Sequence, residues 1–188
     1  TVDDTVPVLY NATLNYGTGL MSVKASETID VTPHGNVDFS KMFLSSSTGD
    51  HHVSLLGSSI VSVDHVEFNF TLPEQARVKA IAISGTPGGD GTPVVFDIQA
   101  GAVKDVAINN NLGQTNLTVV ETADTIPPHV LNVSLNFSTG ELVIAADETV
   151  DTTPRSLVNL SRLYLSKSTG DFDIPLVRSS VIESDDLT

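Results

Sequence analysis

The sequence repeats itself after 121 residues, and this repeat limits what the chain can fold into. The segment Leu14–Asp64 aligns without a gap with Leu135–Asp185, and 22 of the 51 aligned positions are identical. Many other positions exchange residues of one class, as Tyr16 and Phe137 do. Similarity at a fixed spacing is the signature of a tandem array. We therefore expect one unit over residues 1–123 and the N-terminal part of a second, truncated unit over residues 124–188.

Arrays of similar units supply length, spacing and repeated surfaces, whereas catalysis needs only one site. The sequence has no G-x-S-x-G nucleophile motif, and the Gly-rich segment Ser84–Thr92 lacks the Lys-Ser/Thr of a phosphate-binding loop. The pair His51-His52 could bind a metal, but the second copy has Phe172-Asp173 there. We therefore expect no enzymatic activity.

Charge and composition exclude several classes of partner. The 188 residues carry a net charge of -14 and include no cysteine. Such a surface repels nucleic acid and anionic lipid, and no apolar run reaches the roughly 18 residues of a membrane span. We expect neither nucleic-acid binding nor direct membrane insertion.

Short apolar segments at even spacing, separated by Gly and Pro turns, predict an all-β fold of the sandwich class. One segment differs, because Pro73 and Glu74 are typical of a helix start and predict a short helix over Pro73–Ala82. The expected strands are 8–15, 20–26, 38–44, 53–56, 60–63, 66–72, 93–99, 103–108 and 117–121.

Three motifs recur in both copies: D-T-x-P-P, L-N-x-x-T-G-x-L and S/D-E-T-I/V-D. They occupy Asp124–Pro128, Leu135–Leu142 and Asp147–Asp151, and in the first copy Asp4–Pro7, Leu14–Leu20 and Ser26–Asp30. The first copy departs from the pattern, since Val8 stands at the second proline. These motifs resemble the immunoglobulin-like and cadherin-like tandem repeats of large extracellular surface proteins of bacteria, protists and algae. The resemblance implies immunoglobulin-like β-sandwiches in tandem, one short helix per repeat, a cell-surface location and an adhesive, spacer or filament-forming role.

Six N-x-[S/T] triplets indicate N-linked glycosylation of an extracellular protein. Asn11 and Asn132 are equivalent in the two copies. Strand alternation places Asn11 opposite the face of Tyr10, Ala12 and Leu14. Similarly, Val66, Phe68, Phe70 and Leu72 are expected to face inward and Asn69 outward. The alternative is that these Asn and Thr residues only serve turns and solvent-facing strand positions. The six candidates are Asn11, Asn69, Asn116, Asn132, Asn136 and Asn159.

Acidic residues near strand ends suggest Ca²⁺, which takes carboxylate and carbonyl oxygens, usually about six to eight. An ion there could lock the connector between units. The alternative is that these residues serve turns and solubility, and no EF-hand spacing occurs. The candidate ligands are Glu27, Asp30, Asp105, Asp124, Glu148 and Asp151.

The sequence therefore predicts a non-catalytic structural subunit of an extracellular glycoprotein array that forms a surface filament, appendage or coat by self-association. One alternative is an adhesion or ligand-binding protein with carbohydrate or cell-surface partners, in which these repeats are a spacer. A second is an accessory domain of a larger secreted enzyme.

Overall fold

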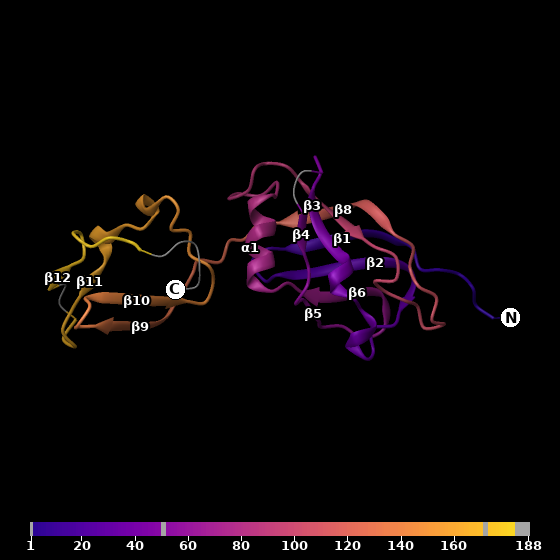
Figure 1. Cartoon of the computed structure of the whole chain (residues 1–188), viewed down its shortest axis with the longest axis horizontal. Coiled ribbons are helices and arrows are strands. Elements are labelled where there is room, and N and C mark those ends of the chain that lie inside the picture. Colours follow the sequence, from indigo (N-terminus) through magenta and orange to yellow (C-terminus); the bar gives the residue numbers. More distant parts are fainter. Residues whose placement is uncertain (1, 50–51, 171–172, 183–188) are drawn as a thin grey trace. The chain divides into compact units, whose positions relative to one another are not determined.

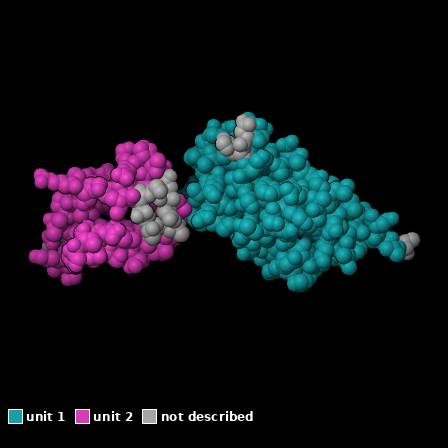
Figure 2. Space-filling view, viewed as in Figure 1, with its two compact units in different colours: residues 1–126 teal, residues 127–188 magenta. Residues whose placement is uncertain are grey.

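The computed structural model describes residues 2–49, 52–170 and 173–182. The chain divides into two compact units, residues 1–126 and residues 127–188, which Figure 2 shows in separate colours. The division follows Ile126, three residues after the expected boundary at residue 123. His51 of the His51-His52 pair and Asp185, at which the aligned repeat ends, lie outside the described residues.

Unit 1 is dominated by β-strands (Figure 1). Eight strands form one continuous hydrogen-bonded sheet, in the order β4-β3-β7-β8-β1-β2-β6-β5. Two 3-10 turns, η1 (His34–Asn36) and η2 (Phe39–Lys41), precede β3. The strands are β1 (Leu9–Asn15), β2 (Leu20–Ile29), β3 (Met42–Ser46), β4 (His52–Ser54), β5 (Ser59–Ile60), β6 (His65–Thr71), β7 (Val94–Ile98) and β8 (Gln114–Thr122).

Strand β8 joins the two halves of this arrangement. Its first part pairs antiparallel with β7, as at Leu117 and Phe96. Its last part pairs parallel with β1, as at Val119 and Ala12. Side chains from both halves belong to one buried hydrophobic cluster, so the halves cover each other's apolar faces. The largest fully buried side chains include Tyr16, Phe68, Phe70, Phe96, Leu14, Met21, Met42 and Leu44.

A β-bulge in β1 changes the expected alternation. Leu9 pairs with Ala25 and Asn11 pairs with Lys24, so Tyr10 is an extra residue without a cross-strand partner in the register. Leu9 is therefore buried and Tyr10 is 59% exposed. The prediction that Tyr10 shares a face with Ala12 and Leu14, which are both buried, is wrong, while Asn11 is exposed as predicted.

The predicted helix is present as α1 (Glu74–Ala82), with Pro73 at its N-cap position. Its buried residues are Ala76, Arg77 and Ala80. Figure 1 shows α1 at the end of unit 1 opposite to the N-terminal lead-in.

Unit 2 contains elements that follow those of unit 1 by 121 residues. Strand β9 (Val130–Asn136) corresponds to β1, and β10 (Glu141–Ala146) corresponds to β2. The turns η3 (Arg155–Leu157) and η4 (Leu160–Arg162) correspond to η1 and η2. The short strands β11 (Tyr164–Leu165) and β12 (Ile174–Pro175) pair as β3 and β4 do.

The correspondence extends to individual hydrogen bonds. The bulge of β1 recurs in β9, where Val130 pairs with Ala146 and Asn132 with Ala145. The amide of Ser26 donates to the carbonyl of Val8 at 2.8 Å, and the amide of Asp147 donates to that of His129 at 3.0 Å. The two segments therefore share backbone structure as well as sequence.

Candidate functional site

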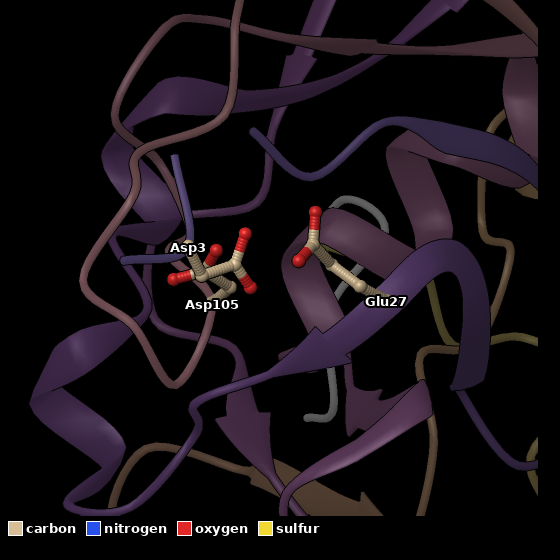
Figure 3. A group of neighbouring side chains, drawn as sticks. All are labelled: Asp3, Glu27 and Asp105. Carbon is tan, nitrogen blue, oxygen red and sulfur yellow. The ribbon is translucent and has the colours of Figure 1, made fainter. Parts of the chain in front are cut away.

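Three carboxylates lie close together at one end of unit 1. Asp3 comes from the N-terminal lead-in, Glu27 from β2, and Asp105 from the loop between β7 and β8 (Figure 3). One carboxylate oxygen of each lies within 4.8 Å of the others. We call Asp3, Glu27 and Asp105 the acidic cluster.

Asp105 is 1% exposed and organises its loop. Its two carboxylate oxygens accept hydrogen bonds from the backbone amide and the side-chain amide of Asn109, each at 2.8 Å. Burial raises the pKa of Asp105, but these hydrogen bonds outweigh it, so that the pKa lies below its ordinary value. Asn109 also donates to the carbonyl oxygen of Asp3 at 3.2 Å, which ties the lead-in to the loop.

This loop replaces the strand that the sequence predicts over Val103–Ile108. Only isolated bridges form there, between Lys104 and Asn110 and between Asp105 and Ile29. Asn109 donates back to Asp105 and closes a tight loop, in which Ile108 has a φ of 73°. That prediction is wrong, because a side-chain hydrogen bond outcompetes strand pairing.

Within the acidic cluster, Glu27 is the residue whose pKa is raised. Its Oε1 atom is buried and has no hydrogen-bond partner. Burial, together with the charges of Asp105 and Asp3, raises the pKa of Glu27. A cation beside Oε1 would relieve this repulsion, and hard oxygen donors suit Ca²⁺. Three carboxylates supply part of its coordination sphere, and water would supply the rest.

The other four predicted ligands lie outside the acidic cluster. Asp30 and Asp151 each accept a backbone hydrogen bond two residues ahead, from Thr32 at 3.1 Å and Thr153 at 3.0 Å. These are turn contacts, as the alternative interpretation supposed. Asp124 forms an ion pair in unit 1, and Glu148 belongs to unit 2.

The cluster therefore combines Glu27 and Asp105, which the sequence predicted as ligands, with Asp3, which it did not. Asp3 precedes Asp124 by 121 residues, which is the spacing of the aligned repeat, whereas the D-T-x-P-P motif pairs Asp4 with Asp124. Within the described ranges, these three residues are the one group of acidic or histidine side chains close enough to hold a metal ion.

The candidate glycosylation sites differ in exposure. Five of them are exposed: Asn11, Asn116, Asn132, Asn136 and Asn159. Asn136 and Asn159 use Oδ1 to accept the backbone amides of Ser138 at 3.0 Å and Ser161 at 3.1 Å. Their side-chain nitrogens are not used in these two hydrogen bonds and are the atoms a glycan would modify.

Asn69 lies on the face of β6 opposite to Phe68 and Phe70, as expected, but it is only partly exposed. It lines an open groove beside β5 together with His34, Val61 and Val63, and its Oδ1 is buried. The segment after β5 lies beside this part of β6, since Ser62 Oγ accepts the backbone amide of Asn69 at 2.9 Å.

The inward-facing pattern predicted for the same strand, β6, holds for its central residues. Phe68 and Phe70 are buried, and so is Leu72, which follows the strand. Val66 is 42% exposed, so its predicted inward orientation is wrong.

A serine, a histidine and an aspartate also meet in unit 1, which the sequence did not indicate. Ser45 Oγ donates to Asp97 Oδ2 at 2.5 Å and lies 2.6 Å from His52 Nδ1. In a catalytic triad, the histidine lies between serine and aspartate. Here the serine lies between them and is 2% exposed. This arrangement connects strands β3, β4 and β7 and does not prepare a nucleophile.

The comparisons with known proteins give no relative from which a function could be transferred. No family model matches the chain, and neither a curated protein nor a solved structure matches it. In the part of the chain that the structure describes, no helix has the length and apolarity needed to cross a membrane.

Proposed function

We propose that this chain is a non-catalytic structural part of an extracellular glycoprotein array, built from immunoglobulin-like β-sandwiches in tandem. The observation that carries the proposal is the recurrence of strands, 3-10 turns, a β-bulge and hydrogen bonds at one spacing of 121 residues. A protein that repeats a whole structural unit repeats its surfaces as well.

The strand order supports the immunoglobulin-like interpretation. One half of unit 1 has the order β1-β2-β6-β5, and the other has β4-β3-β7-β8. If β1, β2, β5 and β6 are named A, B, D and E, the first half has the A-B-E-D order of that fold. The second half then contains strands C, F and G, with an additional strand beside C. The chain has no cysteine, so no disulfide links the two halves, and the hydrophobic core and the pairing of β8 with both β7 and β1 hold them together.

Repeated surfaces at a fixed spacing suit a filament or a surface coat. Contacts that recur along an array add their effects even when each is weak. A contact between different faces of equal units produces an open filament when its rotation does not close. The net charge of -14 opposes such contacts, and glycans or divalent cations would reduce this repulsion. The acidic cluster is our candidate for a Ca²⁺ site with that role.

The first experiment measures glycosylation. The chain would be secreted from a eukaryotic host and its peptides examined by mass spectrometry before and after glycosidase treatment. We expect glycans at both Asn11 and Asn132, since both are exposed on equivalent bulged strands. Unmodified asparagine at both positions would contradict the glycoprotein assignment.

The second experiment measures assembly. Sedimentation velocity of the secreted chain over a wide concentration range should show species that grow with concentration. The same measurement after removal of glycans, and after chelation at constant ionic strength, separates their contributions. A chain that stays monomeric in every condition would contradict self-assembly and favour the adhesive spacer.

A further inference from the structure

We propose that Arg77 and the turn between β1 and β2 form a receptor for the connector that leads from one unit to the next. Its ligand is the acidic start of that connector, Asp124–Ile126. This inference rests on the proposed tandem arrangement and names the contact that attaches this connector to unit 1.

Arg77 is a buried, ion-paired residue of α1. It is 7% exposed although it carries a full charge. Its Nε and Nη2 atoms donate to the two carboxylate oxygens of Glu74, each at 2.7 Å. This bidentate pair fixes the plane of the guanidinium group and directs Nη1 away from Glu74.

The Nη1 atom reaches both the turn and the connector. It donates to the carbonyl oxygen of Tyr16 at 2.9 Å and to Asp124 Oδ2 at 2.5 Å. Tyr16 ends the first arm of the β1–β2 hairpin, and its amide donates to the carbonyl oxygen of Thr122 at 3.0 Å. The end of β8 is therefore held beside the turn, and Asp124 follows it by two residues.

Asp124 carries the contact into the connector. Its Oδ1 atom accepts the backbone amide of Ile126 at 2.9 Å. One carboxylate thus links the arginine of α1 to the last residue of unit 1, after which Pro127 begins unit 2.

The turn is shaped to admit this connector. A Cβ atom on Gly17 would lie 3.2 Å from Asp124 Oδ1 and 3.3 Å from Ile126 Cδ1. These distances are shorter than ordinary carbon contacts, so a side chain at this position would press against the connector. The glycine allows the connector to lie directly on the turn.

The N-terminal lead-in shows which part of the Asp124 structure forms without Arg77. Asp3, which precedes Asp124 by 121 residues, makes the same local turn by accepting the backbone amide of Thr5 at 3.1 Å. The turn at Asp3 therefore forms without an arginine partner among the described contacts, since the carboxylate of Asp3 lies in the acidic cluster. What Arg77 adds at Asp124 is attachment to the preceding unit.

The experiment compares backbone dynamics of the full chain with those of Asp124→Asn and Asp124→Ala. The asparagine variant keeps an oxygen for the Ile126 amide but loses the charge that pairs with Arg77. Nuclear magnetic resonance order parameters of the Thr125 and Ile126 amides are the readout. In the wild-type chain we expect values near those of rigid backbone, about 0.85, and in the alanine variant values below about 0.6. The asparagine variant should lie between them.

Asp151→Asn is the matched control, because Asp151 makes a similar local turn with Thr153 and has no arginine partner among the described contacts. It should leave the order parameters of Thr125 and Ile126 unchanged. Amides in β1 and β2 show that each variant is folded. Rigid Thr125 and Ile126 amides in both Asp124 variants would overturn the proposal, and so would mobile ones in the wild type.

This result is independent of the assembly experiment. If the chain remains monomeric but Thr125 and Ile126 become mobile on substitution of Asp124, the receptor proposal is supported and self-assembly is contradicted. If the chain assembles but the order parameter of the Ile126 amide does not change on substitution of Asp124, only the receptor proposal is contradicted.

Discussion

Asp38 and Asn159, which lie 121 residues apart, cap equivalent 3-10 turns with the same two hydrogen bonds. Asp38 Oδ1 accepts the amide of Ser40 at 3.1 Å and its hydroxyl at 2.5 Å. Asn159 Oδ1 accepts the amide of Ser161 at 3.1 Å and its hydroxyl at 2.6 Å. Only an oxygen is needed for this cap, because aspartate and asparagine form it equally. The side-chain nitrogen of Asn159 is thus dispensable for it.

A glycan at Asn159 should therefore be compatible with the cap. We expect mass spectrometry of the secreted chain to detect modification of Asn159, and Asn159→Asp to remove it while leaving the chemical shifts of η4 essentially unchanged. Asn159→Ala, which removes the oxygen, should alter those shifts. Equal disturbance by both substitutions would contradict this role of the oxygen.

The hydroxyl of Tyr16 should stabilise unit 1 through Glu121. Tyr16 is fully buried and donates to Glu121 Oε1 at 2.7 Å, and burial together with Glu121 raises its pKa. Tyr16→Phe keeps the ring but leaves this carboxylate oxygen without its donor, at a cost of about 1–3 kcal/mol in the free energy of unfolding. Urea denaturation measures this cost.

Tyr10→Phe is the control for this substitution. Tyr10 is 59% exposed, so removing its hydroxyl should change the free energy of unfolding by less than about 0.5 kcal/mol. Equal effects at the two tyrosines would contradict the assignment.

The acidic cluster should make stability depend on pH through Glu27. Because burial and the neighbouring charges of Asp105 and Asp3 raise the pKa of Glu27, the folded state favours the protonated carboxyl. The stability from this group is present below its unfolded pKa of about 4.3 and is lost as pH rises through the higher folded value. In chelator, Glu27→Gln should therefore melt at a higher temperature than the wild type near neutral pH. The difference should shrink below about pH 4.

Calcium should reverse this order. It should raise the melting temperature of the wild type and have a smaller effect on Glu27→Gln, since the variant lacks one ligand. Glu67→Gln serves as a control, because Glu67 forms a surface pair with Lys24 at 3.7 Å. A Glu27→Gln variant that is less stable than the wild type in chelator would contradict the repulsion described here. An equal rise in melting temperature on addition of calcium to the wild type and to Glu27→Gln would contradict a metal site at Glu27.

Local sequence signals predicted much of unit 1. Alternating apolar residues identified strands such as β1 and β6, and Pro73 with Glu74 identified the start of α1. The bulge at Tyr10 was not predicted, because alternation of residue types does not reveal an extra residue in one strand. The loop over Val103–Ile108 looks like a strand in the sequence, but its fold depends on the side chain of Asp105 and on the partner Asn109.

The candidate site was harder to predict, because its members meet through tertiary structure. Glu27 and Asp105 are 78 positions apart and come together through the bridge between Ile29 and Asp105. Asp124 carried the same local signal as Asp3, yet its partner is Arg77. Sequence spacing alone does not distinguish an acidic residue that faces two carboxylates from one that faces a guanidinium group.

Unit 2 has the backbone of the corresponding part of unit 1 but not its burial. Phe137 is 91% exposed, whereas Tyr16 at the equivalent position is fully buried. Val133 is 50% exposed, and its equivalent Ala12 is buried. In unit 1 these positions are covered by a core to which β6, β7 and β8 contribute. Strands equivalent to β6, β7 and β8 should therefore bury the corresponding face of unit 2 when they are joined to it.

Calorimetry of a hybrid chain tests whether both units are copies of one fold. Residues 65–126 would be joined directly after Asp185, the position that corresponds to Asp64, in a chain that begins at Pro127. The hybrid should unfold in one cooperative transition, as residues 1–126 should alone, while residues 127–188 alone should show none. A hybrid that melts without a cooperative transition, under conditions where residues 1–126 show one, would contradict the claim.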